Sequence, residues 1–178
     1  MAYFSKFPKG VYDIKGDGNV KLVTDLMRRI KIRSKIRDEV SLYQTYDVPN
    51  GERPEHTAFK HFGDTELHWI ILMTNDITDA YYDWPLSEQD FESYVNDKYD
   101  NPGTVHHYEV TQSSGKQTGN GPDDYTHMIE VNSDTVGAQS VSNYEYEQRL
   151  QDKKRTVRLL QPQYLGLFIE EFERLIRN

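Results

Sequence analysis

The chain has 178 residues, 36% of them hydrophobic, no cysteine and a formal net charge of −8. The lack of cysteine excludes disulfide scaffolds, thiolate zinc sites and cysteine nucleophiles. No run approaches the roughly 18 uninterrupted apolar residues of a membrane span, and residues 1–10 lack the apolar stretch of a signal peptide, so we expect a protein that folds in a reducing cytosol.

Charge is distributed unevenly along the chain. Residues 1–41 hold ten Lys/Arg against five Asp/Glu, residues 42–148 four against twenty, and residues 149–178 seven against four. An acidic middle between basic ends favours docking among oppositely charged proteins and disfavours nucleic acid. The 13 tyrosines are typical of interfaces, although ordinary core tyrosines explain the number equally well.

Residues 1–19 are rich in Gly, Asp, Asn and Pro, which predicts an extended arm. Its aromatics, among them Phe4, Phe7 and Tyr12, are expected to pack on the protein's own core or on a partner. The spacing of the apolar residues from Val23 to Ile30 then predicts a helix.

From Ile30 to Arg37, isoleucines alternate with cations, which predicts a strand with a basic face that includes Arg33 and Arg37. Such a face is usually solvated, or keeps a sheet edge soluble. A nucleic-acid site is the sharper alternative, and an acidic protein partner is the interpretation we favour.

The stretch from Tyr46 to Asn75 predicts a short strand, a turn at Asn50-Gly51 and two helices. Pro54 suits a first helical turn, and Gly63 suits a helix end. The layout resembles a LysM module, in which the matching residues are Tyr46, Val48, Gly51, Ala58, Phe62, Gly63, Leu67 and Asn75. This resemblance implies binding of N-acetylglucosamine polymers, with Trp69, Tyr81 and Trp84 as stacking rings. The single copy and the altered turn Gly51-Glu52-Arg53-Pro54 argue against it, so binding of peptidoglycan or chitin is kept as the alternative.

The next stretch carries Tyr81, Tyr82 and Trp84, which we interpret as an exposed aromatic cluster and a candidate hot spot. Ser87 is placed to cap a helix through Val95. Residues 103–110 and 125–131 predict two strands of a hairpin with a long, mobile loop, and residues 132–140 predict a further polar loop.

Residues 143–154 predict a helix and residues 155–160 a short strand. Apolar side chains then recur at helical spacing on one face of a terminal amphipathic helix, including Leu165, Phe168, Phe172 and Ile176. This stripe either completes the fold or forms a helix-in-groove contact with a partner.

No arrangement of residues predicts a catalytic site. His56 and His61 are five residues apart, not the four that align two ligands on a helix, and His106 and His107 are expected on opposite faces of a strand. We therefore expect no metal, no cofactor and no enzymatic activity.

These patterns together predict an α+β fold. Its centre is a small β-α-α-β module, joined by an N-terminal arm, a β-hairpin insertion and a C-terminal amphipathic helix. The expected segments are 1–41 (arm and basic strand), 42–100 (module and aromatic extension), 101–140 (hairpin) and 141–178 (strand and helix).

A wider resemblance rests on Phe7-Pro8 with Tyr12, on GERPEHTAFKHFGDTELHWIILMTNDITDAYYDWPLS (51–87) and on NYEYEQRLQDKKRTVRLLQPQYLGLFIEEFERLI (143–176). On these residues the chain resembles the LysM-bearing baseplate wedge subunits of T-even-type contractile-tailed phages. The resemblance implies a structural protein of the virion tail baseplate, assembled in the host cytoplasm and present in several copies. Its expected partners are the other wedge proteins and the sheath-initiating subunit. It is also expected to help fasten adjacent wedges to one another. Neither nucleic acid nor membrane is an expected partner.

Overall fold

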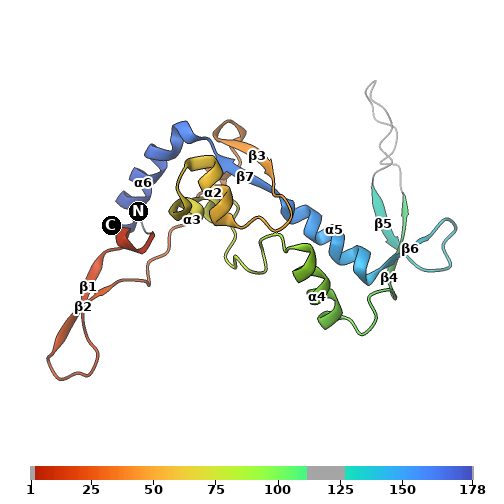
Figure 1. The fold of residues 1–178 in the computed structure, drawn as a ribbon, viewed down its shortest axis with the longest axis horizontal. Helices are drawn as coiled ribbons and strands as arrows, with labels where there is room; N and C mark the ends of the chain where they lie inside the picture. Colours follow the sequence, from red (N-terminus) through yellow and green to blue (C-terminus); the bar gives the residue numbers. More distant parts are fainter. Residues whose placement is uncertain (1–2, 112–126, 178) are drawn as a thin grey trace. The chain divides into compact units, whose positions relative to one another are not determined.

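The structure, a computed structural model, describes residues 3–111 and 127–177 and is a mixed α and β fold, as predicted (Figure 1). The chain forms two compact units. The first comprises residues 1–85 and 154–178, and the second comprises residues 86–153. The four-segment division expected from the sequence stays a prediction.

The first unit contains most of the elements. In chain order they are η1 (Tyr3–Lys6), β1 (Lys9–Asp13), β2 (Val20–Thr24), α1 (Ser34–Arg37), η2 (Val40–Leu42), β3 (Tyr43–Asp47), α2 (Pro54–Phe62), η3 (Thr65–Leu67), α3 (His68–Thr74), β7 (Thr156–Leu160), η4 (Pro162–Tyr164) and α6 (Leu165–Arg177). The second unit contains α4 (Glu88–Lys98), β4 (Val105–Thr111), β5 (Met128–Val131), β6 (Gln139–Ser142) and most of α5 (Asn143–Arg155).

The predicted strand–helix–helix unit is present as β3, α2 and α3. Pro54 occupies the first helical turn, and Gly63 ends α2 in the left-handed conformation at φ 79°. The strand that pairs with β3 is β7, which runs antiparallel to it with Tyr43 opposite Leu160 and Asp47 opposite Thr156. The chain thus builds the whole second unit between α3 and β7.

Asn75 joins the end of α3 to β7. Its side-chain amide donates to the carbonyl oxygens of Ile71 (2.8 Å) and Arg158 (2.9 Å), and its Oδ1 accepts from the Arg158 backbone N–H (2.8 Å). These bonds satisfy a helix-terminal carbonyl and the backbone of one β7 residue. Behind them a buried cluster fills the space between the helices and the sheet: Val48, Ala58, Ile71, Trp84, Val157 and Leu159.

The two described ends of the chain share a second buried cluster. Phe7 and Tyr3 from the N-terminal end pack with Trp69 of α3 and Phe172 of α6; the Trp69 and Phe172 ring centroids lie 4.5 Å apart. Lys6, itself buried, forms an ion pair with Glu173. The terminal apolar stripe therefore completes the protein's own core, which is one of the two fates that the sequence left open.

The second unit is a three-stranded antiparallel sheet with strand order β5-β4-β6, accompanied by α4 and α5. The predicted pairing of the two hairpin strands is confirmed, with Tyr108 opposite Val131. The expected loop tip lies outside the described residues. Residues 132–140 were wrongly expected to be loop throughout, because β6 begins at Gln139 and pairs with β4.

Two predictions for the N-terminal third were wrong. Val23 lies in β2, and residues 25–33 form no helix. The Asp25 carboxylate accepts a hydrogen bond from the Met27 backbone N–H (3.1 Å), which competes with helix formation. Residues 30–33 form no strand and residues 34–37 form α1. Lys31 and Arg37 instead reach the Asp76 carboxylate, each at 3.2 Å.

Candidate interaction surfaces

The structure divides the twelve candidate contact residues by exposure. Phe7, Trp84, Phe172 and Ile176 are buried, and Arg37, Leu165 and Phe168 are half-buried. The exposed ones are Phe4, Tyr12, Arg33, Tyr81 and Tyr82. The exposed group is fully available for a contact without a change in the fold, whereas the half-buried side chains offer only part of their surface.

Trp84 corrects the interpretation of 81–84 as one exposed cluster. Its side chain is 4% exposed, and its indole N–H donates to the Glu52 carbonyl oxygen at 2.7 Å. A buried indole needs such a partner, and the turn before α2 supplies it. Trp84 is therefore an internal anchor that holds the end of the 79–84 turn.

Tyr81 and Tyr82 remain on the surface, 66% and 57% exposed, with ring centroids 4.9 Å apart at an interplanar angle of 83°. Asp79 fixes their turn, because its Oδ1 accepts from the backbone N–H of Tyr81 (2.9 Å) and of Tyr82 (3.3 Å). The Lys154 ammonium donates to the Tyr82 carbonyl oxygen (2.7 Å). A fixed backbone thus presents two large amphipathic rings, which lowers the ordering cost of a contact.

Glu52 organises the turn that leads into α2. Its carboxylate is buried and accepts from the hydroxyls of Tyr46 (3.1 and 3.2 Å) and Thr57 (2.8 Å) and from the Lys60 ammonium. Burial alone would raise the pKa of Glu52, but the hydrogen bonds from Lys60, Thr57 and Tyr46 together hold that pKa below its ordinary value.

A shallow groove of about 390 Å³ lies beside this turn, between residues 49–52 and the α2 side chains His56, Phe59 and Lys60. A second groove, of about 730 Å³, lies between residues 29–32 and α3. Phe4, Trp69 and Met73 contribute apolar surface to it, and the indole N–H of Trp69 has no hydrogen-bond partner among the described residues.

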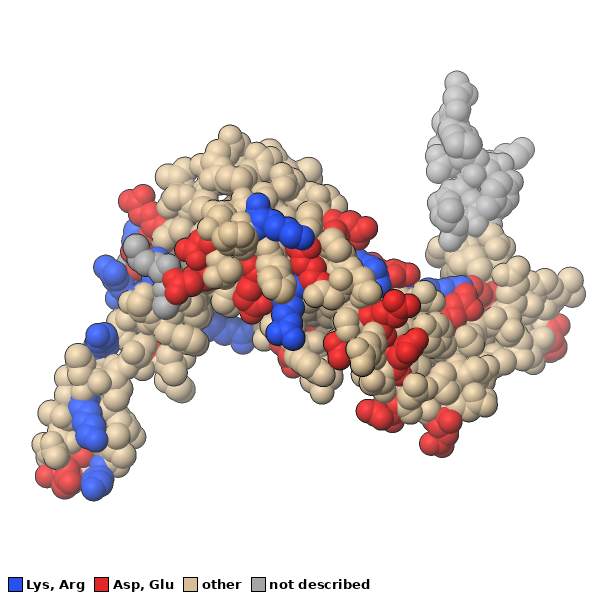
Figure 2. Space-filling model, viewed as in Figure 1, with Lys and Arg blue, Asp and Glu red and all other residues tan. Residues whose placement is uncertain are grey.

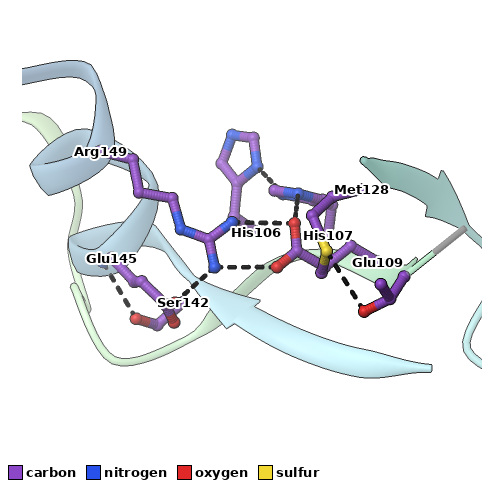
Figure 3. A network of polar contacts seen from close by, with 8 residues as sticks. His106, His107, Glu109, Met128, Ser142, Glu145 and Arg149 are labelled. Carbon is purple, nitrogen blue, oxygen red and sulfur yellow. Dashed lines mark hydrogen bonds and ion pairs between the residues drawn. The ribbon is translucent and has the colours of Figure 1, made fainter. Parts of the chain in front are cut away.

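The second unit contains a charged network around Glu109 on β4 (Figure 3). Arg149 of α5 binds the Glu109 carboxylate through two N–H groups, both at 2.8 Å, and also reaches Glu145 at 2.6 Å. The guanidinium of Arg149 holds the pKa of buried Glu109 below its ordinary value. A bidentate pair of this kind stabilises the packing of α5 on β4 and also fixes the angle between the helix and the strand.

His106 and His107 do not point to opposite faces. Their Nδ1 atoms lie 2.9 Å apart (Figure 3). The His106 ring also stacks on Tyr146 at a centroid distance of 3.9 Å. A β-bulge between Val105 and His107 breaks the alternation that the sequence argument assumed. In residues 3–111 and 127–177, no group of three or more His, Asp or Glu side chains is placed to hold a metal ion.

One group of exposed residues was not singled out from the sequence. These are the apolar side chains of the β1–β2 hairpin, Val11, Val20, Leu22 and Val23, with Ile14 in its loop. A signal was present, because short β-branched runs flank the Gly16–Asn19 turn formers.

Comparison with known proteins decides the family. The family model described as base plate wedge protein 53 matches residues 14–119 of this chain. The chain belongs to that family. Family membership places the protein in the tail baseplate of the virion.

One relative is the baseplate wedge protein gp53 of Enterobacteria phage T4, 33% identical over 81 residues. The aligned stretch covers 46% of this chain and 41% of the relative, so the chain spans less than half the length of that protein. The family match includes β3, α2, α3 and α4, whereas β7 and α6 lie beyond it. Within the described parts of the chain, no helix is long and apolar enough to span a bilayer.

Proposed function

We propose that the protein is a structural docking component of the baseplate wedge that binds other wedge subunits and helps to fasten adjacent wedges. The observation that carries this proposal is the fixed turn bearing Tyr81 and Tyr82. Paired exposed tyrosines on a backbone held by Asp79 and Lys154 have the composition and rigidity of an interface hot spot.

We further propose that the scaffold is a LysM-like module whose surfaces bind other proteins in place of a glycan. The order β3, α2, α3, β7, with the two strands antiparallel, is the β-α-α-β order of such a module, interrupted by the second unit. No chemistry is needed from it, since the buried carboxylates of Glu52 and Glu109 are engaged by hydroxyl and cationic groups of the fold itself. In this proposal the protein acts as a structural component and not as an enzyme.

The proposed partners are the other wedge proteins and the sheath-initiating baseplate subunit of the same phage, with several copies of this chain in each baseplate. Charge supports this choice. The acidic middle of the chain lies between segments with a cationic excess, an arrangement that gives complementary contacts with different neighbours.

Glycan binding is the second candidate, because the groove beside Glu52 exposes the ring of Phe59. Two of the three rings expected to stack on sugars are unavailable, since Trp69 is 5% and Trp84 4% exposed. Titration with N-acetylglucosamine oligomers by calorimetry separates the candidates. We expect no heat of binding at millimolar oligomer, and saturable binding that Phe59→Ala abolishes would favour the glycan function instead.

The docking function is tested by replacing both tyrosines with alanine in the full chain. The dissociation constant is measured by biolayer interferometry against a wedge assembled from the other wedge proteins of the same phage. We expect Tyr81→Ala with Tyr82→Ala to weaken binding by at least about tenfold. Phe59→Ala, which removes an equally exposed ring from α2, is the matched control and should change the constant less than twofold. Equal effects of both variants would contradict the assignment.

A further inference from the structure

Exposed apolar side chains concentrate near the N-terminus. Of the twenty large hydrophobic side chains that are exposed in the described residues, nine lie between positions 4 and 27. They are Phe4, Val11, Tyr12, Ile14, Val20, Leu22, Val23, Leu26 and Met27. Single exposed apolar residues need no explanation, but a contiguous group marks an interaction surface.

Most of this group belongs to the β1–β2 hairpin, and it occupies both faces of the ribbon. Residues paired across an antiparallel ladder share a face, so Val11 and Leu22 lie on one side. Tyr12 and Val23 lie on the other. Val11 and Leu22 are 67% and 65% exposed, and Tyr12 is 60% exposed. The apolar surface is therefore two-sided.

The ribbon is held by its ends and not by a core. At the loop, the Asp13 carboxylate accepts from the backbone N–H groups of Lys15 (3.1 Å), Gly16 (2.7 Å) and Gly18 (2.8 Å), which lower the pKa of Asp13. At the base, the Asp25 N–H donates to the Pro8 carbonyl oxygen (2.9 Å), next to buried Phe7. Between these ends, Figure 1 shows no helix or strand of the first unit laid across either face.

An isolated two-stranded ribbon is only marginally stable in water. Two apolar faces in contact with water make it less favourable still, because apolar surface costs free energy when it is not buried. A partner that lies against one face would leave the other in water. A cleft that receives the ribbon between two walls covers both. The geometry therefore favours insertion over flat packing.

Charge indicates the nature of the walls. The hairpin carries Lys9, Lys15 and Lys21 against Asp13 and Asp17, and Arg28 and Arg29 follow its base after Asp25, so cations remain in excess. In Figure 2 the hairpin is mostly tan, with separate blue side chains along it and red ones near its tip. Arg28 is partly engaged, since one of its N–H groups donates to the Ile176 carbonyl oxygen (3.0 Å). An apolar ribbon bordered by cations is complementary to an apolar cleft with an acidic rim.

We propose that the β1–β2 hairpin inserts into an acidic-rimmed apolar cleft of a neighbouring baseplate protein, which covers both of its faces. This inference rests on the proposed function, because it assigns one contact of the docking component to a stated element and to a partner of stated chemistry. It is independent of the Tyr81–Tyr82 turn, which lies on a different segment of the first unit.

The test uses the full chain and the wedge assembled from the other wedge proteins of the same phage. One variant, Val11→Ser with Leu22→Ser, changes the first face, and another, Tyr12→Ser with Val23→Ser, changes the second. Each is expected to raise the dissociation constant at least about tenfold, since burying one such side chain is sufficient for that change. The control is Leu167→Ser, an exposed leucine on α6, with an expected change of less than twofold.

Folding of each variant is checked by the fluorescence of Trp69 and Trp84, which lie in cores that the hairpin side chains do not enter. Lys21→Glu should weaken binding more at low salt than at high salt, because dissolved ions screen charge pairs at the rim of an interface.

Five outcomes overturn the inference. Unchanged binding of both face variants, while the wild-type chain binds, removes the hairpin from the interface and leaves the proposed function standing. If only one of the two face variants loses binding to the wedge, the hairpin packs flat against its partner through that face and does not insert into a cleft. If the wild-type chain binds vesicles of anionic phospholipid and the hairpin variants do not, the hairpin is assigned to a membrane. If the wild-type chain self-associates and the hairpin variants do not, the hairpin is assigned to a second copy of the chain. If the wild-type chain does not bind the wedge at all, the proposed function fails as well.

Discussion

Phe172→Ala is the substitution that most directly tests whether α6 belongs to the protein's own core. Phe172 is 3% exposed, and its ring centroid lies 4.5 Å from that of Trp69, 5.6 Å from that of Tyr3 and 6.4 Å from that of Phe7. The substitution leaves a cavity among these three rings. Because it removes contacts with both α3 and the N-terminal end, it should loosen the two described ends of the chain together.

The magnitude follows from burial. Replacing a fully buried phenylalanine with alanine costs about 3–5 kcal/mol, and lost ring–ring contacts are included in that range. The matched control is Leu167→Ala on the same helix, where the side chain is 67% exposed and the expected change is within about 0.5 kcal/mol. Both variants introduce alanine into α6, so helix propensity does not explain a difference between them.

Urea unfolding followed by tryptophan fluorescence is the assay. The chain has two tryptophans, and both Trp69 and Trp84 lie in the first unit, so the signal reports that unit and not the second. With a slope of about 1–3 kcal/mol per molar urea, a loss of 3 kcal/mol lowers the midpoint by about 1–3 M. Equal midpoints for Phe172→Ala and Leu167→Ala would refute the packing of α6 into this core.

Three further predictions concern the polar contacts. Glu52→Gln should destabilise the first unit by about 1–3 kcal/mol at pH 7. Because the folded-state pKa of Glu52 lies below its ordinary value of 4.5, the wild-type contribution is present above that pH and is lost as the pH falls through the folded pKa. The gap between the urea midpoints of wild type and variant should therefore narrow as the pH is lowered below 4.5, and a gap that stays constant down to acid unfolding would contradict this. Asn75→Ala should cost about 1–3 kcal/mol through the lost bonds to Arg158, and an unchanged urea midpoint would disprove that role. Arg149→Met should increase amide exchange in β4 of the second unit at neutral pH, since it leaves the Glu109 carboxylate buried without its bidentate partner; unaltered exchange would show that the pair is not needed.

The elements that local pattern determines were predictable from the sequence. Pro54 and Gly63 mark the ends of α2, and Ser87 accepts from the Asp90 N–H (3.2 Å) at the start of α4 as expected. The apolar period of residues 165–176 predicted α6 for the same reason. Each of these signals acts within one or two turns of the chain, where propensity and capping decide the structure.

What the sequence did not reveal depends on distant partners. The burial of Trp84 follows from a carbonyl 32 residues earlier in the chain, and the pairing of β3 with β7 spans the whole second unit. The cations of residues 30–37 alternate as in a strand, yet two of them, Lys31 and Arg37, form ion pairs with Asp76. For the candidate contacts, exposure was the deciding quantity, and a stripe of apolar residues does not tell whether its cover is internal or external.

Amide hydrogen exchange on the free protein and on the protein bound to the wedge tests the account most directly. We predict that α6 exchanges slowly in both states, because Phe172 and Ile176 are buried in the chain's own core. The β1–β2 hairpin should exchange quickly in the free protein and slowly when bound. Rapid exchange of α6 in the free protein with protection only in the wedge, together with a hairpin that the wedge leaves unchanged, would contradict it.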